Sequence, residues 1–149
     1  MNGNKEYSLD QISKNLFIGD YYASINLKLL VSIGITHILV CGYELVCRYP
    51  KRFKYHHLKI DDSPNQQISQ FFAETFEFID EGVQTGSVLI HCAQGRSRSV
   101  SFGISFIMRK KHLNFNRAFS KVQNKHSESN PNRGFVAQLQ DYELVLGLR

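Results

Sequence analysis

Two side chains that could act together on an anion lie in the segment 87–100. Cys92 follows a short apolar run that is typical of a buried strand, and Arg98 opens a run that is typical of a helix. A loop between a strand and a helix directs backbone N–H groups and a helix N-terminus at one point, where anions bind and a thiolate is favoured. The pattern therefore predicts a nucleophilic cysteine at the floor of an anion site.

The residues between Cys92 and Arg98 fit a loop that wraps around a tetrahedral dianion. Arg98 would present a planar pair of donors to the oxygens of a phosphoryl group, which a lysine could not do. Gly95 allows the backbone to turn tightly and to approach a ligand closely. We expect the loop to bind phosphate through Ala93, Gln94, Gly95, Arg96, Ser97 and Arg98.

A simpler interpretation makes Cys92 a core cysteine and Arg98 a solvated residue at a helix start. Several specified residue types in one strand-to-helix context argue against it, namely His91, Cys92, Gly95, Ser97, Arg98 and Ser99. This segment resembles the signature of the cysteine-dependent protein tyrosine phosphatase superfamily, and within it the small single-domain dual-specificity protein phosphatases. The resemblance extends over residues 11–147, through the segments 15–19, 34–38, 62–72 and 131–139.

The resemblance implies hydrolysis of a phosphate monoester through a cysteinyl phosphate on Cys92, with Arg98 binding the phosphate. The leaving oxygen needs a proton, which a carboxyl group can supply and later take from the attacking water. The resemblance places this general acid before the Phe-rich segment, where Asp62 matches best and Asp61 is the alternative. Without the Cys92 loop, residues 61–64 would be interpreted as a turn.

Three further residues have expected roles around this loop. The resemblance implies that Ser99 hydrogen-bonds the sulfur and eases its departure, although helix capping is compatible with that role. We expect His91 to order the loop and to help hold the thiolate, without transferring a proton. Asn132 matches a family position that braces the active-site face, and the start of a helix explains it equally well. The other histidines are expected to be ordinary surface or core residues: His37, His56, His57, His112 and His126.

The length of 149 residues fits one domain, and we expect a single catalytic domain over residues 1–149. The cysteines Cys41, Cys47 and Cys92 form no paired framework and have no metal-ligand spacing, so we expect no metal and no cofactor. They also indicate a reducing compartment, the cytoplasm, with the nucleus as the alternative. Cys41 could form a disulfide with an oxidised Cys92, but a buried small hydrophobic role is the preferred interpretation.

The formal net charge of +5 favours an acidic or phosphorylated partner. The basic residues are dispersed and form no nucleic-acid-reading motif, so we expect no nucleic-acid partner. No apolar run is long enough to cross a membrane, so we expect no membrane association. We expect a monomer. The resemblance implies phosphorylated proteins as substrates, through phosphotyrosine and phosphoserine or phosphothreonine. Two alternatives stay open: a phosphatase of a phosphoinositide, phosphorylated sugar or RNA 5′-phosphate, and a phosphoprotein-binding module without turnover.

Strands that alternate with helices predict an α/β domain of three layers. We expect a central, mainly parallel and twisted sheet of about five strands with helices on both faces, as in protein tyrosine phosphatases. Ligands of such sheets bind beyond the carboxyl ends of the strands, which is where Cys92 lies. The expected strands surround Asn15 and cover 37–41, 55–60 and 87–90, and the expected helices cover 23–31, 68–83, the run after Arg98, 115–122 and 135–146.

Overall fold

The computed structural model describes residues 6–148 as a sheet of five strands and its surrounding helices. The elements follow in the order β1 (Leu9–Ser13), β2 (Leu16–Gly19), α1 (Tyr21–Ser24), α2 (Leu27–Ser32), β3 (Ile35–Cys41), β4 (Lys54–Leu58), η1 (Ser69–Phe71), α3 (Phe72–Thr85), β5 (Ser87–His91), α4 (Arg98–Lys111), α5 (Phe115–Lys125) and α6 (Arg133–Val145). None of the helices in this range is long and apolar enough to cross a membrane.

The strand order in the sheet is β1-β2-β5-β3-β4. Strands β2, β5, β3 and β4 run parallel to one another, and the edge strand β1 is antiparallel to β2. Strand β5 lies in the middle, and all five of its residues are buried, as expected for a strand that is covered on both faces. The prediction of a mainly parallel sheet is therefore confirmed.

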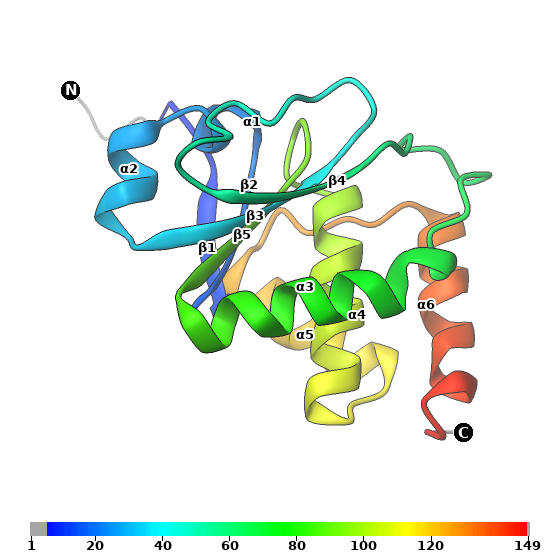
Figure 1. Ribbon diagram of the computed structural model, residues 1–149. Coiled ribbons are helices and arrows are strands. Elements are labelled where there is room, and N and C mark those ends of the chain that lie inside the picture. The colour runs from blue at the N-terminus through cyan, green and yellow to red at the C-terminus, as the bar shows by residue number, and fades with distance from the viewer. Residues whose placement is uncertain (1–5, 149) are drawn as a thin grey trace.

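Helices cover both faces of this sheet (Figure 1), and successive residues of β5 show which helices lie on which face. A Cβ placed on Gly19 would lie 3.1 Å from Ala23 of α1 and 3.2 Å from the side chain of Leu89. A Cβ placed on Gly82 of α3 would instead collide with Val88. Because neighbouring side chains in a strand point to opposite faces, α1 and α3 lie on opposite sides of the sheet. The expected three layers are present.

Helix α4 runs through the interior of the domain. All of its residues from Arg98 to Met108 are buried, as expected for a helix that is covered on every side. It packs against β5 and β2 on the sheet side and against α3, α5 and α6 elsewhere. The first residue of this buried helix is therefore fixed in place by the core, and that residue is Arg98.

The helix predicted over 23–31 is wrong in one respect, because the structure contains two short helices there. The side chain of Asn26 accepts a hydrogen bond from the backbone N–H of Leu29 at 3.1 Å and so begins α2 as a new helix. The apolar periodicity continues across the break, which is why it predicts one element. The other expected elements are confirmed with small shifts of their ends, and α3 is preceded by the single turn η1.

Candidate active site

Cys92 directly follows β5, at the carboxyl end of the central strand of the sheet. Its buried sulfur accepts a hydrogen bond from the backbone N–H of Gly95 at 3.2 Å and lies 3.2 Å from the hydroxyl oxygen of Ser99. Both groups can donate to a sulfur that carries negative charge. The family resemblance implied a hydrogen bond between Ser99 and the sulfur, and the structure brings the Ser99 hydroxyl within reach of it.

Three carbonyl groups in the loop of residues 92–98, those of Ala93, Gly95 and Arg96, are bonded by parts of the chain that are distant in the sequence. Their donors come from three other parts of the chain: the N–H of Tyr21 to the oxygen of Ala93 at 3.0 Å, the Nε2 of His126 to Gly95 at 2.5 Å, and the N–H of Asn130 to Arg96 at 2.7 Å. All described peptide bonds are trans, so the N–H that follows each carbonyl points the opposite way. Those N–H groups belong to Gln94, Arg96 and Ser97.

A cavity of about 200 Å³ opens above the sulfur. Asp62 reaches it from the other side, and its carboxylate accepts a hydrogen bond from the side-chain amide of Asn132 at 2.9 Å. Asp61 does not line this cavity, so the geometry favours Asp62 over its neighbour. The lining consists of Asp62, Cys92, Ala93, Gln94, Arg96, Ser97 and Arg98.

The guanidinium of Arg98 is oriented by two acceptors. Glu44 accepts from Nη1 at 2.8 Å and from Nη2 at 2.7 Å, and the carbonyl of Ile60 accepts the second Nη1 hydrogen at 3.2 Å. Burial opposes the charge, but the bond to Glu44 raises the pKa of Arg98, and the same bond lowers the pKa of Glu44. The edge formed by Nε and the remaining Nη2 hydrogen is left for a bidentate contact with an anion.

Gly95 adopts φ = 71°, a left-handed conformation that L side chains rarely occupy. A Cβ at this position would also lie 3.0 Å from the carbonyl oxygen of Gly19. The loop can therefore turn back over the sulfur of Cys92 only because residue 95 is a glycine. The left-handed conformation agrees with the tight turn expected at Gly95, and the close neighbour of this residue is the backbone of β2.

His91 is fully buried at the end of β5, and its Nδ1 donates to the carbonyl of Cys92 at 3.4 Å. Its Nε2 has no hydrogen-bond partner among the described residues. Burial lowers the pKa of His91 to about 4, so the ring is neutral at physiological pH. It can order the loop through its hydrogen bond, but it brings no positive charge to the thiolate.

Asn132 performs both functions that the sequence left open. Its side-chain oxygen accepts from the N–H of Phe135 at 2.9 Å and caps α6, while its amide nitrogen donates to Asp62. Its own backbone N–H donates to the hydroxyl of Ser97 at 2.9 Å. One residue therefore connects α6 with the 92–98 loop and with the carboxylate opposite it.

Sequence reasoning missed Glu44 and His126. Glu44 lies in the connection between β3 and β4, where no periodicity distinguishes it, and its partner Arg98 is 54 residues away. His126 was expected to be an ordinary residue, yet it is completely buried and bonds the carbonyl of Gly95. The sequence carries no local signal for either contact.

Cys41 is a free, fully buried thiol on β3, and burial raises its pKa well above the ordinary value. This environment agrees with the preferred interpretation of Cys41 as a small hydrophobic residue. Cys47 is also free and lies partly exposed in the connection between β3 and β4. The three thiols of the chain are therefore unpaired in this structure.

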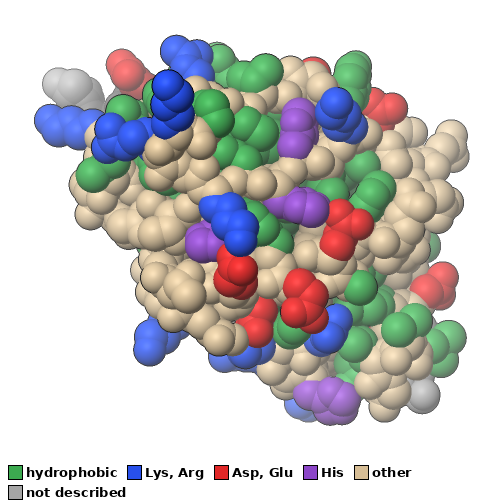
Figure 2. Space-filling view, in the orientation of Figure 1, with side chains coloured by type: hydrophobic (Ala, Val, Ile, Leu, Met, Phe, Trp, Pro, Cys, Tyr) green, Lys and Arg blue, Asp and Glu red, His purple; other side chains and the backbone are tan. Residues whose placement is uncertain are grey.

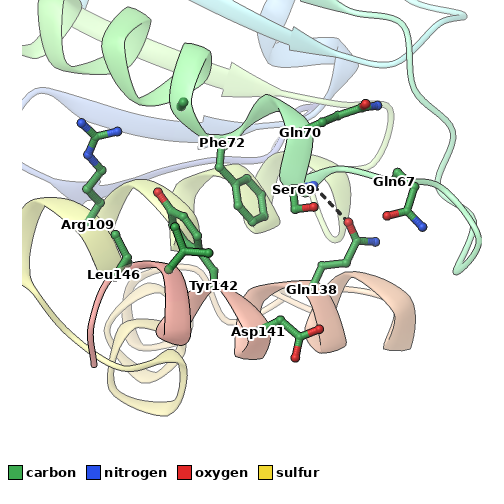
Figure 3. A pocket seen from close by; sticks show the side chains of 11 residues that line it. Gln67, Ser69, Gln70, Phe72, Arg109, Gln138, Asp141, Tyr142 and Leu146 are labelled. Atoms are coloured by element: carbon green, nitrogen blue, oxygen red, sulfur yellow. Dashed lines mark hydrogen bonds between the residues drawn. The ribbon is translucent and has the colours of Figure 1, made fainter. Parts of the chain in front are cut away.

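A larger cavity of about 650 Å³ lies elsewhere, between the start of α3 and the helix α6 (Figure 3). Its walls are formed by the rings of Phe72 and Tyr142 with glutamine, aspartate and arginine side chains around them, and it contains no cysteine or histidine. The smaller cavity at Cys92 holds the groups that can react. Size alone therefore does not identify the site.

The face of the molecule seen in Figure 2 carries acidic, basic and histidine side chains that are intermingled. Ion pairs connect α3 with the neighbouring strands β3 and β4: Glu81 contacts Lys54 at 2.7 Å and His37 at 2.8 Å, and Glu74 contacts His56 at 2.7 Å. A continuous basic stripe, which a nucleic-acid backbone would need, is not seen on this face.

Comparison with known proteins gives a consistent picture. Residues 16–144 match the family model described as dual specificity phosphatase, catalytic domain. Dual specificity protein phosphatase 1B of Arabidopsis thaliana is 35% identical over 136 residues, which cover 91% of this chain and 81% of the relative. Human dual specificity protein phosphatase 9 is 40% identical over 141 residues, which cover 93% of this chain but only 37% of that relative.

Among solved structures, that of the human tyrosine phosphatase-like serine/threonine/tyrosine-interacting protein superposes with a TM-score of 0.87 at 38% identity. The match covers 92% of this chain and 96% of the other. The structural match therefore extends over nearly the whole of that solved chain.

Proposed function

The chain belongs to the dual specificity phosphatase family, and we propose that it hydrolyses phosphotyrosine and phosphoserine or phosphothreonine through a phosphoenzyme on Cys92. The family makes it a protein phosphatase, a hydrolase that acts on phosphoproteins. The observation that carries the proposed mechanism is the cavity in which the sulfur of Cys92, the guanidinium of Arg98 and the carboxylate of Asp62 meet.

In the first step, the thiolate of Cys92 attacks phosphorus and the bond from phosphorus to the leaving oxygen breaks. The phosphoryl oxygens lie against the free edge of Arg98 and the backbone N–H groups of the 92–98 loop, which stabilise the charge of the transition state. Asp62, in its protonated form, donates its proton to the leaving oxygen. The products are the dephosphorylated side chain and a cysteinyl phosphate.

In the second step, water attacks the phosphorus of the cysteinyl phosphate and the sulfur leaves as a thiolate. Asp62, now ionised, takes a proton from the water. The hydroxyl of Ser99, 3.2 Å from the sulfur, donates a hydrogen bond to the departing thiolate. Inorganic phosphate is released, and the starting protonation states return when the product leaves.

This mechanism needs Cys92 in its reduced form. The cytoplasm and the nucleus keep thiols reduced, and we propose the protein works in one of these compartments. The three unpaired thiols support this assignment.

The test is turnover of an aryl phosphate and of phosphotyrosine and phosphothreonine peptides, with a chelator present. We expect Cys92→Ser to abolish turnover and Cys47→Ser, the matched cysteine outside the site, to retain it. Rapid quenching of the wild type should trap one phosphoryl group on the protein, at Cys92. Turnover that persists in Cys92→Ser would exclude the mechanism.

The likeness to a human protein named as phosphatase-like and interacting favours one second candidate, a module that captures phosphoproteins without turnover. The candidates differ in the fate of the bound phosphate. A single stoichiometric release of phosphate, or tight binding of a phosphopeptide without release, supports the binding module. Repeated release supports the enzyme.

A further inference from the structure

His126 lies between strand β1 and the 92–98 loop, and none of its side chain is exposed. Its Nε2 is 2.5 Å from the carbonyl oxygen of Gly95, and its Nδ1 is 2.6 Å from a carboxylate oxygen of Asp10. Glu128 adds a second carboxylate oxygen at 3.6 Å from Nδ1, and the hydroxyl of Ser8 donates to that carboxylate. The ring therefore joins the edge strand of the sheet to the loop above Cys92.

The contact with Gly95 fixes one hydrogen of the His126 ring. A carbonyl oxygen only accepts hydrogen bonds, so Nε2 must carry a hydrogen toward Gly95. On the other side of the ring, Nδ1 shares a hydrogen with the carboxyl group of Asp10, and this second bond holds the ring in its orientation.

A metal ion could also occupy this cluster, because the ligand atoms of Asp10, His126 and Glu128 lie within 4.8 Å of one another. The separation of 2.6 Å between Nδ1 and the Asp10 oxygen argues against a metal. Two atoms bound to one tetrahedral ion at about 2.1 Å lie roughly 3.4 Å apart. The observed distance is that of a charge-assisted hydrogen bond.

The contact with Gly95 acts on the neighbouring peptide group. The peptide between Gly95 and Arg96 is planar and trans, so holding its carbonyl toward His126 turns the N–H of Arg96 in the opposite direction. Arg96 lines the cavity above the sulfur. A ring that lies outside the cavity thus controls the direction of one of the donors inside it.

We propose that His126 is a positioning residue, whose buried ring ties Asp10 to Gly95 and aims the Arg96 N–H at the bound phosphate. This inference rests on the proposed function of the 92–98 loop as the phosphate site. The ring does not touch the phosphate, and its effect should appear in the binding of a tetrahedral dianion.

The first experiment compares His126→Gln with a matched control, His56→Gln. Both substitutions remove a histidine that pairs with a carboxylate. His56 lies on β4 and pairs with Glu74 of α3, away from the 92–98 loop. We expect His126→Gln to raise KM for an aryl phosphate and the inhibition constant of tungstate by roughly tenfold, as for a lost hydrogen bond to a charged group. His56→Gln should leave both constants unchanged.

The second experiment locates the hydrogen on the ring directly, by ¹⁵N NMR of protein labelled at histidine. We expect the Nε2 of His126 to carry a hydrogen that is bonded to the Gly95 carbonyl in the wild type, and Asp10→Asn to weaken this bond because the ring loses its second anchor. Asp10→Asn should also weaken tungstate binding, by less than His126→Gln. If His126→Gln fails to fold, Asp10→Asn carries the test alone.

A His126 ring without a hydrogen on Nε2 in the wild type, or unchanged tungstate inhibition in both variants, would overturn the proposal. Loss of activity on adding a chelator, restored by zinc, would overturn it as well and assign the cluster to a metal. If the proposed function is wrong, the wild type itself shows no turnover. Tungstate binding measured by calorimetry would still test the role of His126, so the two failures can be distinguished.

Discussion

Glu44 binds the end of the Arg98 guanidinium through both carboxylate oxygens, at 2.8 and 2.7 Å. The two residues are 54 positions apart and belong to different elements, the β3–β4 connection and the first turn of α4. This pairing turns the Nε edge of Arg98 toward the cavity above Cys92. The arginine that the mechanism needs is thus oriented by a carboxylate that never touches the phosphate.

Glu44→Gln should weaken phosphate binding more than it slows the chemical step. Glutamine presents one acceptor and one donor to the guanidinium, so the bidentate bond is lost and Arg98 can rotate. We expect KM to rise by roughly tenfold, because a bond to a charged group contributes about 1.5 kcal/mol or more and Glu44 is partly exposed. The measurement is steady-state kinetics beside Glu74→Gln, a paired carboxylate on α3 that should leave KM unchanged.

Asp62→Asn should reduce kcat/KM for a phosphopeptide by roughly a hundredfold, the usual contribution of a general acid. Activity of the wild type should fall as pH rises, because the acid must be protonated to serve the leaving oxygen. We expect this basic limb of the pH profile to disappear in Asp62→Asn. Asp61→Asn is the matched control and should retain the limb. Loss of the limb in Asp61→Asn alone would reassign the acid.

Gly95→Ala should impair both stability and activity, and Gly34→Ala provides its control. Both glycines have a positive φ, 71° and 81°, so alanine strains the backbone at either site by about 1–2 kcal/mol. A Cβ at Gly34 meets nothing within 4 Å, whereas at Gly95 it meets the carbonyl of Gly19 at 3.0 Å. Denaturant unfolding should show the larger loss for Gly95→Ala, and only this variant should lose tungstate binding.

Protonation of His91 should destabilise the fold at mildly acidic pH. Burial lowers the pKa of His91 to about 4 in the folded protein, while an unfolded histidine has about 6.5. Between these values the unfolded state binds the extra proton, so this contribution to stability is present above pH 6.5 and is lost as pH falls toward 4. Denaturant unfolding should show a loss of about 2 kcal/mol between pH 6.8 and pH 5.

His91→Gln removes the titrating ring and should show a correspondingly smaller loss over the same range. An identical pH dependence in the wild type and in His91→Gln would mean that the folded ring titrates normally. The two proteins should differ in how far the denaturant midpoint shifts with pH, while the denaturant dependence (m) stays the same. This is expected because stability changes and the surface exposed on unfolding does not.

The parts of the site that the sequence predicts are those encoded over short distances. Cys92, Gly95 and Arg98 fall in one segment, whose strand and helix have clear apolar patterns, so their meeting follows from local structure alone. Asp62 is farther away, and its assignment depended on a resemblance together with the chemistry of a leaving oxygen. The fold was predictable for a similar reason, since a local apolar run or an amphipathic pattern marks most of the elements.

What the sequence did not predict are contacts between distant polar residues. Asp10 and His126 are 116 residues apart, and they meet only because α5 packs against β1. No hydropathy pattern marks a polar residue that becomes buried in this way. The break at Asn26 was missed for a different reason, because a side-chain cap can interrupt a helix without disturbing its apolar spacing.

The three outward-facing carbonyls of the 92–98 loop have one more consequence. Their donors come from Tyr21, His126 and Asn130, so neighbouring groups of the protein hold the loop in this shape. A dianion that enters finds dipoles that are already aligned, and the loop gives up little conformational entropy when it binds. The site is preorganised, and the same rigid donors can serve the ground state, both transition states and the phosphate that finally leaves.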